Sequence, residues 1–274
     1  RGPELLSDLV NLGEGSPDDT AYDEETLESV SDMRRYFRRR MFRIQAGSIC
    51  LERPIFTTLG QTSDLGDMMI RTAYRIAVEQ TTASRPPSNA KYRPKDQLLV
   101  VALGRLGMRE FDLGSDADLV FILPESDAEE QQFWTRVAER LIDLLTAYTG
   151  EGVMFAVDTR LRPNGREGGL VQLESAYRNY FGGKAEAWEG ITYMKSRTVA
   201  GNIAHGTKFL EELQVIDWKR YGQSGRSQHE LRRMRMRLEK EQSANNPLKA
   251  GGGGYYDIDF SLMYLRLKSA GIFY

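Results

Sequence analysis

Two short apolar runs, residues 97–103 and 117–123, constrain the fold of this chain more than any other feature. Together they are rich in Leu, Val, Ile and Phe, and each is bounded by turn residues, which is typical of buried strands. A glycine-bearing turn separates them, and residues 153–162 predict a third strand after an intervening helical pattern. The order strand, turn, strand, helix, strand predicts an α/β core.

Helical periodicity flanks this core, beginning with a helix from about residue 27 that ends at Gly47 as its C-cap. A second helix is expected from Asp64 to about Glu79. The first helix has an apolar face and an arginine-rich opposite face, formed by Met33, Phe37, Met41 and Ile44, and by Arg34, Arg35, Arg38, Arg39 and Arg43. Such a basic face is more often solvent-exposed or paired with acidic residues than bound to nucleic acid, and both interpretations stay open.

Cap and turn residues set further helix boundaries. Ser126 with Glu129 has the form of a capping box for the helix between the second and third strands, which should end at Gly150. Ser227 with Glu230 predicts the same start for a later arginine-rich helix. More helices are expected around residue 188, over 209–215 and over 257–267, the last after a turn of four glycines.

These patterns divide the chain into three regions. Residues up to about 23 are rich in Gly, Pro, Ser and Asp and predict a loose lead-in, and three prolines at 86, 87 and 94 mark a boundary. We expect an N-terminal helical lead-in at 1–90, a core at 91–182 and a C-terminal helical region at 183–274. The chain begins without Met and stops soon after a helical pattern, which suggests that the last region is truncated.

Composition excludes several classes of function. One cysteine, Cys50, can form no internal disulfide, and with only His205 and His229 a histidine-based triad or metal cage is not expected. The sequence has no apolar stretch long enough to cross a bilayer, and its first residues do not form a signal peptide. A formal net charge of -2 argues against a nucleic-acid coat protein. Carboxylates, Arg, Lys and the backbone must therefore carry any chemistry, in what we expect to be a cytoplasmic protein.

Acidic residues gather at the strand ends. Asp116 and Asp118 are two positions apart at the start of the second run, so both should point to one face, and the predicted third strand does the same for Asp158, Arg160 and Arg162. Paired carboxylates repel each other unless a hard cation lies between them, and Mg²⁺ prefers such oxygen ligands together with substrate phosphates. Three carboxylates beside two arginines suit a two-metal phosphoryl transfer site, although each piece alone also fits an ordinary turn or a half-exposed strand.

The turn before Asp116 adds features that suit a phosphate. Gly104 and Gly107 would let the backbone approach a phosphate chain, and Arg105 supplies positive charge. The pattern is neither a P-loop nor a dinucleotide fingerprint.

These segments resemble the glutamine synthetase adenylyltransferase family. The segments that carry the resemblance are Leu103-Gly104-Arg105-Leu106-Gly107 with Glu110, Gly114-Ser115-Asp116-Ala117-Asp118-Leu119-Val120-Phe121, Val157-Asp158-Thr159-Arg160-Leu161-Arg162-Pro163-Asn164-Gly165, Ala187-Trp188-Glu189, Lys195-Ser196-Arg197, and Lys249-Ala250-Gly251-Gly252-Gly253-Gly254 before Asp257-Ile258-Asp259-Phe260. The resemblance spans about residues 34–267. Departures are Met108, where the family often has glycine, and Tyr255-Tyr256, where an aliphatic and a polar residue are usual.

The resemblance implies a DNA polymerase beta-like nucleotidyltransferase fold, a mixed sheet with flanking helices, in the core region. It implies Mg²⁺-dependent transfer of AMP from ATP to a tyrosine hydroxyl of glutamine synthetase, in a bifunctional enzyme whose second such domain removes AMP by phosphorolysis. A chain of 274 residues holds one of the two domains. Asp158-Thr159 and the Asp257-Ile258-Asp259-Phe260 segment favour the adenylylating half, whereas Lys195-Ser196-Arg197 fits the other half about as well.

On this basis the site residues receive roles. Asp116 and Asp118 would bind the metal that holds the triphosphate, and Asp158 would join them at a second metal and help deprotonate the tyrosine. The phosphates would contact Gly104, Arg105 and Ser115, while Arg160 and Arg162 would neutralise charge near the nucleotide or pair with Asp158. Trp188 and Glu189 are interpreted as packing and capping residues, and Lys195 and Arg197 as secondary candidates.

The family further implies glutamine synthetase as protein substrate and, through the full-length enzyme, a nitrogen-signalling regulatory protein as partner. Neither a membrane nor a nucleic acid is expected. Three rival functions remain: the phosphorolytic half on the same fold, an RNA nucleotidyltransferase suggested by the arginine-rich helices, and an interaction module that lost its substrate. The clustered aspartates argue against the last, because a lost site has no reason to keep costly charge.

Overall fold

The computed structural model describes Val10, Leu27 and residues 29–273. The predicted lead-in, up to about residue 23, lies outside the described residues apart from Val10. Described elements include α2 (Val30–Cys50), α3 (Ile55–Ser84), β1 (Leu99–Ala102), α4 (Gly104–Gly107), β2 (Ala117–Leu123), η3 (Glu125–Glu130), α5 (Gln131–Thr146), β3 (Val157–Asp158), η4 (Gly165–Glu167) and β4 (Val171–Leu173). They continue with α6 (Glu174–Asn179), η5 (Tyr180–Lys184), α7 (Ala187–Tyr193), β5 (Arg197–Ala200), α8 (Ile203–Asp217), η6 (Trp218–Gly222), α9 (Gly225–Gln242), α10 (Pro247–Ala250) and α11 (Tyr255–Phe273).

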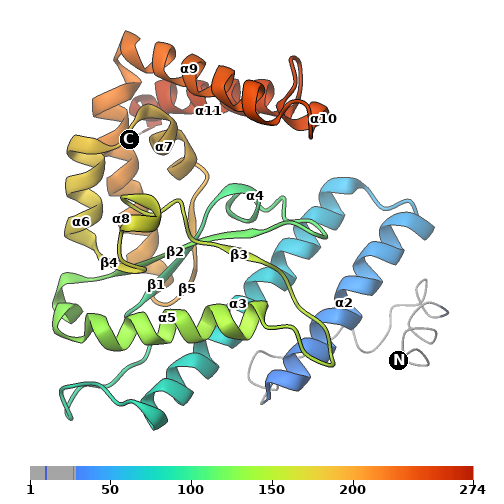
Figure 1. Ribbon diagram of the computed structural model, residues 1–274, viewed down its shortest axis with the longest axis vertical. Coiled ribbons are helices and arrows are strands. Elements are labelled where there is room, and N and C mark those ends of the chain that lie inside the picture. Colours follow the sequence, from blue (N-terminus) through green and yellow to red (C-terminus); the bar gives the residue numbers. More distant parts are fainter. Residues whose placement is uncertain (1–9, 11–26, 28, 274) are drawn as a thin grey trace.

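A small mixed sheet lies at the centre, in the order β3-β2-β1-β5. β1 pairs antiparallel with both β2 and β5. The free edge of β2 is shared by two parallel neighbours, because β3 pairs with its first two residues and β4 with its last three. Strands and helices therefore form the mixed α/β architecture that the sequence predicted, with helices on both faces of the sheet (Figure 1).

The core follows from alternation along β1 and β2, every residue of which is buried except the half-buried Asp118. One set of side chains, including Val100, Leu119 and Phe121, packs against α2, α3 and α5. The alternate set, including Val101 and Val120, packs against α6, η5 and α8. Because both faces are covered, the two strands are continuously apolar, which is why they stood out in the sequence.

The first helix ends later than predicted, and its arginines are engaged within the protein. α2 continues through Gly47 to Cys50, so Gly47 is a buried residue inside the helix and not its C-cap. Arg34 is buried too, with Nη2 donating to Leu144 O at 3.0 Å. The arginine-rich face is thus partly internal, and Arg35 and Arg38 pair with the carboxylate of Glu151.

The second helix is longer than predicted. α3 begins at Ile55 and runs for 30 residues to Ser84, where the predicted break at the prolines is confirmed. Its two extra turns at the N-terminal end contain Thr58 and Ser63. Ser63 donates to Leu59 O and also accepts the Phe111 N–H, whereas the buried Thr58 hydroxyl has no hydrogen-bond partner among the described residues. These buried polar side chains replace a simple apolar stripe in this part of the helix.

Both predicted capping boxes are wrong. The Ser126 hydroxyl donates to Asp127 Oδ2 at 2.7 Å, and α5 begins only at Gln131, after the short η3 turn, and ends at Thr146. In the later helix the N-cap is Ser224, whose side chain accepts from the Arg226 N–H, while Ser227 is buried in the first turn. Ser224 therefore caps the later helix in place of Ser227, whereas Glu130, the N-cap residue of α5, makes no side-chain cap hydrogen bond.

The third strand is much shorter than the predicted 153–162, since only Val157 and Asp158 pair with β2. Two strands, β4 and β5, were not predicted at all. The helices predicted around residue 188, over 209–215 and over 257–267 are confirmed as α7, α8 and α11. In the described part of the chain, the longest helices are too polar to cross a membrane.

Asp217, the last residue of α8, is buried without compensation. Neither of its carboxyl oxygens has a hydrogen-bond partner among the described residues. Burial raises the pKa of Asp217 well above its ordinary value, with Arg220 opposing and Glu189 adding to the shift. A folded-state pKa above the unfolded one means that the stability present at acidic pH is lost as the pH rises through the folded-state pKa.

We therefore expect Asp217→Asn to raise the free energy of unfolding at pH 7, on the order of 1 kcal/mol or more, because an uncharged isostere removes the cost of an unpaired buried charge. The gain should shrink as the pH falls toward the unfolded-state pKa of about 3.9, below which the wild-type carboxyl is protonated in both states. Urea unfolding of both proteins between pH 4 and 8 measures this. A variant less stable than wild type at pH 7 would mean that the carboxylate has a stabilising partner.

Candidate functional site

The predicted carboxylates meet where β2 begins. Asp118 is the second residue of β2, and its direct partner across the parallel β2–β3 pair is Asp158. Directly paired residues project to the same face, so the two carboxylates are neighbours. Asp116, exposed and two residues before Asp118, lies close enough to repel it. The structure thus brings together all three aspartates singled out in the sequence.

The two neighbouring carboxylates titrate differently. Burial raises the pKa of Asp118 to about 6, and repulsion from Asp158 and Asp116 adds to the shift, with Lys249 and Arg160 opposing it. Hydrogen bonds from Arg160 instead lower the pKa of Asp158 below its ordinary value. Asp158 is therefore held ionised, while the repulsion between the two carboxylates raises the pKa of Asp118.

Arg160 is bound to Asp158 and does not project from an extended strand. Its Nε donates to both carboxyl oxygens of Asp158, and its backbone N–H donates to Oδ1 at 2.9 Å. This local turn ends the strand after two residues. In the described part of the chain, no three His, Cys, Asp or Glu side chains are grouped as metal ligands. The three aspartates share one sheet edge, and the Asp158 carboxylate is bonded to Arg160.

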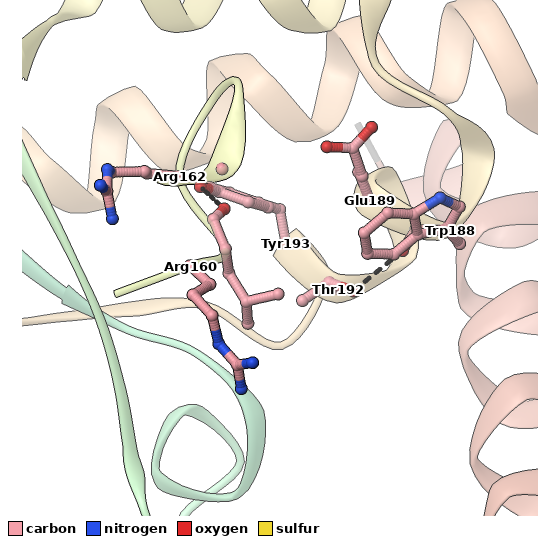
Figure 2. Close-up of a pocket in the computed structure, with 8 residues that line it drawn as sticks. Arg160, Arg162, Trp188, Glu189, Thr192 and Tyr193 are labelled. Atoms are coloured by element: carbon pink, nitrogen blue, oxygen red, sulfur yellow. Dashed lines mark hydrogen bonds between the residues drawn. The ribbon is translucent and has the colours of Figure 1, made fainter. Parts of the chain in front are cut away.

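Arg162 serves the loop that follows. Its Nη1 donates to Thr159 O at 2.6 Å and its Nε to Gly168 O at 3.0 Å, which closes the turn before β4. Figure 2 shows the Arg160 and Arg162 guanidinium groups pointing away from each other and from Trp188. The predicted common face of Asp158, Arg160 and Arg162 is therefore wrong, because the chain leaves the sheet at Thr159.

The two glycines of the first turn serve the protein itself. Gly104 has a φ of +55°, and a Cβ there would lie 2.3 Å from Asp118 Oδ2, so the missing side chain makes room for that carboxylate. A Cβ on Gly107 would lie 1.9 Å from Lys195 O, so Gly107 is needed for backbone packing. The expectation that Gly107 opens the backbone to a phosphate is replaced by this contact, whereas Gly104 does line a cavity.

Arg105 and Ser115, from opposite ends of the same loop, are brought together. Arg105 Nη1 donates to Ser115 Oγ at 3.2 Å, and its guanidinium lies 3.8 Å from Asp112. Arg105 is 43% exposed and lines the same cavity as Asp118. A cation and a hydroxyl thus stand beside the carboxylates, as phosphate binding requires.

A cavity of about 280 Å³ opens next to Asp118. Its polar lining consists of Gly104, Arg105, Asp118, Thr192, Lys195, Lys249 and Asp259, and its aromatic lining of Trp188, Tyr255, Tyr256 and Phe260. A smaller cavity of about 190 Å³, shown in Figure 2, lies against Arg160, Glu189 and Tyr193 and shares Leu161, Trp188 and Thr192 with the first. Charged groups and aromatic rings around one hollow suit a ligand with an anionic and an aromatic part.

Sequence reasoning missed or ranked low several of these residues. Lys195 was a secondary candidate, and its ammonium bonds both carboxyl oxygens of Asp259 from α11, with both side chains largely buried. Arg197 is structural, since it bonds both oxygens of Asp67 and the Leu106 carbonyl. Lys249 and Asp259 were quoted only as family motifs. Glu189 accepts the Glu186 N–H, which confirms its capping role.

Comparison with known proteins shows which family the sequence resembles. The model of the family described as glutamate-ammonia ligase adenylyltransferase matches residues 18–212. Relatives named bifunctional glutamine synthetase adenylyltransferase/adenylyl-removing enzyme include those of Thioalkalivibrio sulfidiphilus, 33% identical over 92% of this chain and 27% of the relative, and Hahella chejuensis, 35% identical over 86% and 26%. The relative from Streptomyces avermitilis is 31% identical over 89% of this chain and 24% of its own length. The chain spans about a quarter of the length of these relatives.

Proposed function

Because the chain belongs to the glutamate-ammonia ligase adenylyltransferase family, we propose that it is a nucleotidyltransferase unit that transfers AMP from ATP to a tyrosine hydroxyl of glutamine synthetase. The observation that carries this proposal is the pair of cross-strand carboxylates, Asp118 and Asp158, beside a cavity that also contains Arg105, Lys195 and Lys249. Carboxylates beside cations are what nucleotidyl transfer from a triphosphate requires. The finer proposal for the fold is the DNA polymerase beta-like nucleotidyltransferase, with residues 91–182 as its core.

The donor set at the start of β2 suits Mg²⁺, because Mg²⁺ takes one or two carboxylates and completes its shell with water and phosphate oxygens. Asp116 and Asp118 would hold the ion, and the space that Gly104 leaves lets the Asp118 carboxylate occupy its position. When bound, Mg²⁺ would neutralise the triphosphate and favour loss of pyrophosphate. Asp158 would join as a ligand of a second ion through the carboxylate that Arg160 holds ionised.

The remaining groups act on the substrates directly. Arg105 and Ser115 would contact phosphate oxygens, and Arg160 would balance charge near the α-phosphate, whereas Arg162 would act by fixing the loop that carries Arg160. A free phenol has a pKa of about 10, so the acceptor tyrosine needs help at neutral pH. Asp158 stays ionised because Arg160 lowers its pKa, so it can accept the hydrogen bond of the hydroxyl and orient its oxygen toward the α-phosphorus. As the tyrosine oxygen bonds to that phosphorus, the bond to pyrophosphate breaks and the hydroxyl proton passes to the Asp158 carboxylate.

The reverse type of reaction is the second candidate, since the relatives are named for both activities. In that direction inorganic phosphate would attack the tyrosine-linked AMP and release ADP. Control by a nitrogen-signalling regulatory protein and a cytoplasmic location are further proposals that come from the family. An RNA substrate is disfavoured, because Arg34, Arg35 and Arg38 of the first arginine-rich helix are engaged within the protein.

The decisive assay separates the two directions. The chain is incubated with unmodified glutamine synthetase, labelled ATP and Mg²⁺, and in parallel with adenylylated glutamine synthetase, phosphate and Mg²⁺. We expect label on glutamine synthetase in the first reaction, at least about tenfold above the same reaction with EDTA. EDTA removes the Mg²⁺ that would neutralise the triphosphate beside the carboxylates. ADP formation in the second reaction alone would assign the chain to the adenylyl-removing half, and the absence of both products would reject the proposal.

A further inference from the structure

The C-terminal helices wall the cavity on the side away from the sheet. Lys195, in the loop before β5, is paired with Asp259 of α11, and Arg266 of the same helix contacts Met108 beside α4. On the other side of the glycine run, Arg235 of α9 donates to Gly251 O at 2.8 Å. α9 and α11 lie at one end of the molecule (Figure 1). These anchors fix α10, the glycine run and the start of α11 next to the start of β2, which carries Asp118.

Lys249 and Tyr256 form a cation–aromatic pair on this wall. The Lys249 ammonium lies 5.4 Å from the centre of the Tyr256 ring, and both residues line the cavity that contains Arg105 and Asp118. Within the described part of the chain, no carboxylate lies at ion-pair distance from Lys249, which is exposed. Tyr256 is half-buried and is held edge-on by Phe260, with ring centres 6.3 Å apart.

A nucleotide matches both members of this pair. Its triphosphate is an anion that a lysine ammonium binds as a point charge, and its base is a flat π-system that stacks on aromatic side chains. The Tyr256 ring is already oriented by Phe260, so little side-chain entropy remains to be lost on stacking. Tyr256 is also where this chain departs from the polar residue usual in the family.

We infer that Lys249 binds the triphosphate and that Tyr256 stacks on the adenine base, so that α10 and the start of α11 form the nucleotide-binding wall of the site. This inference rests on the proposed function, because it needs ATP to occupy the cavity beside Asp118. Lys249 and Arg105 then contact the phosphates from two sides of the cavity. The glycine run between Lys249 and Tyr256 lets the two residues reach the same ligand.

Two ligands separate the two roles. Binding of ATP and of inorganic tripolyphosphate, each with Mg²⁺, is measured by titration calorimetry on the full chain. We expect Lys249→Ala to weaken both ligands by about tenfold or more, and Tyr256→Ala to weaken ATP about tenfold while tripolyphosphate binds as to wild type. Tyr256→Phe keeps the ring and should restore ATP binding to within about twofold of wild type.

The chain supplies a matched control pair on the same helix. Lys268 lies 5.7 Å from the Tyr264 ring, and neither residue lines the cavity beside Asp118. Lys268→Ala and Tyr264→Phe should leave both affinities unchanged, and thermal unfolding of every variant confirms that it is folded. Wild-type ATP affinity in Lys249→Ala and Tyr256→Ala would overturn this inference and leave the proposed function standing. A wild-type chain that binds neither ligand would overturn both.

Discussion

Asp118→Asn is expected to reduce AMP transfer on the order of a thousandfold without unfolding the protein. Asp118 is the half-buried carboxylate of the cross-strand pair that lines the cavity beside Arg105. Its replacement removes a charged ligand for Mg²⁺. A thousandfold slower transfer corresponds to an activation free energy that is higher by about 4 kcal/mol. Transfer of labelled AMP to glutamine synthetase measures the loss. A folded variant with wild-type activity would contradict the proposed site.

The same variant should lose activity but keep or gain stability at neutral pH. Burial raises the pKa of Asp118 to about 6, so the contribution of this carboxyl to the free energy of unfolding is lost as the pH rises through that value. Asparagine removes a charge that Asp158 and Asp116 repel, and we expect the free energy of unfolding at pH 7 to stay equal or rise by roughly 1 kcal/mol. The difference should shrink as the pH falls toward the unfolded-state pKa of about 3.9. Urea unfolding at pH 7 and near that value is the measurement.

Asp158→Asn provides the matched contrast. Arg160 lowers the pKa of Asp158, so this carboxylate stabilises the folded state at neutral pH and loses that effect as the pH falls through its folded-state pKa. The variant should therefore lose both activity and some stability at pH 7. Two neighbouring aspartates with equal effects on activity and opposite effects on stability would separate a catalytic role from a structural one.

The sequence was sufficient for the centre of the fold because β1 and β2 are buried on both faces. Every residue of the two strands is apolar except Asp118, and such a composition is compatible only with strands that are covered on both faces. Asp118 is conspicuous as the one carboxylate within them. Asp158 could be placed beside it only through the third strand, and that prediction was right for the residue and wrong for the strand. Alternation predicts where a side chain points only while the chain is extended, and the Asp158–Arg160 bond ends the extension after two residues.

Other parts of the site had no usable signal. β5 has four residues, too few for a period to be recognised, and its partner β1 lies about a hundred positions earlier. The wall formed by Lys249 and Tyr256 comes from a segment more than 130 positions after Asp118. Its approach depends on tertiary contacts such as Lys195 with Asp259, which no local pattern encodes. The glycine turn was noticed for the right residues, but its packing against Lys195 could be seen only in three dimensions.

Gly107→Ala is expected to lower the free energy of unfolding by roughly 3 kcal/mol. A Cβ at this position would lie 1.9 Å from Lys195 O and 2.9 Å from Ala102 O. Both contacts are with backbone carbonyls, so no side-chain rotation can relieve them, and α4 would have to move away from the loop before β5. Because Lys195 and Asp259 join that loop to α11, the displacement should also disturb the cavity and reduce AMP transfer. Urea unfolding and the transfer assay measure the two effects.

Gly60→Ala is the control, because it makes the same chemical change in a helix. A Cβ on Gly60 of α3 would meet no atom within 4 Å, so the new methyl group has space and the helix gains from the higher propensity of alanine. This variant should be as stable as wild type or more stable by up to about 1 kcal/mol, with unchanged activity. If Gly107→Ala behaved like Gly60→Ala, α4 and the loop at Lys195 could not be in the close contact that places Lys195 in the cavity.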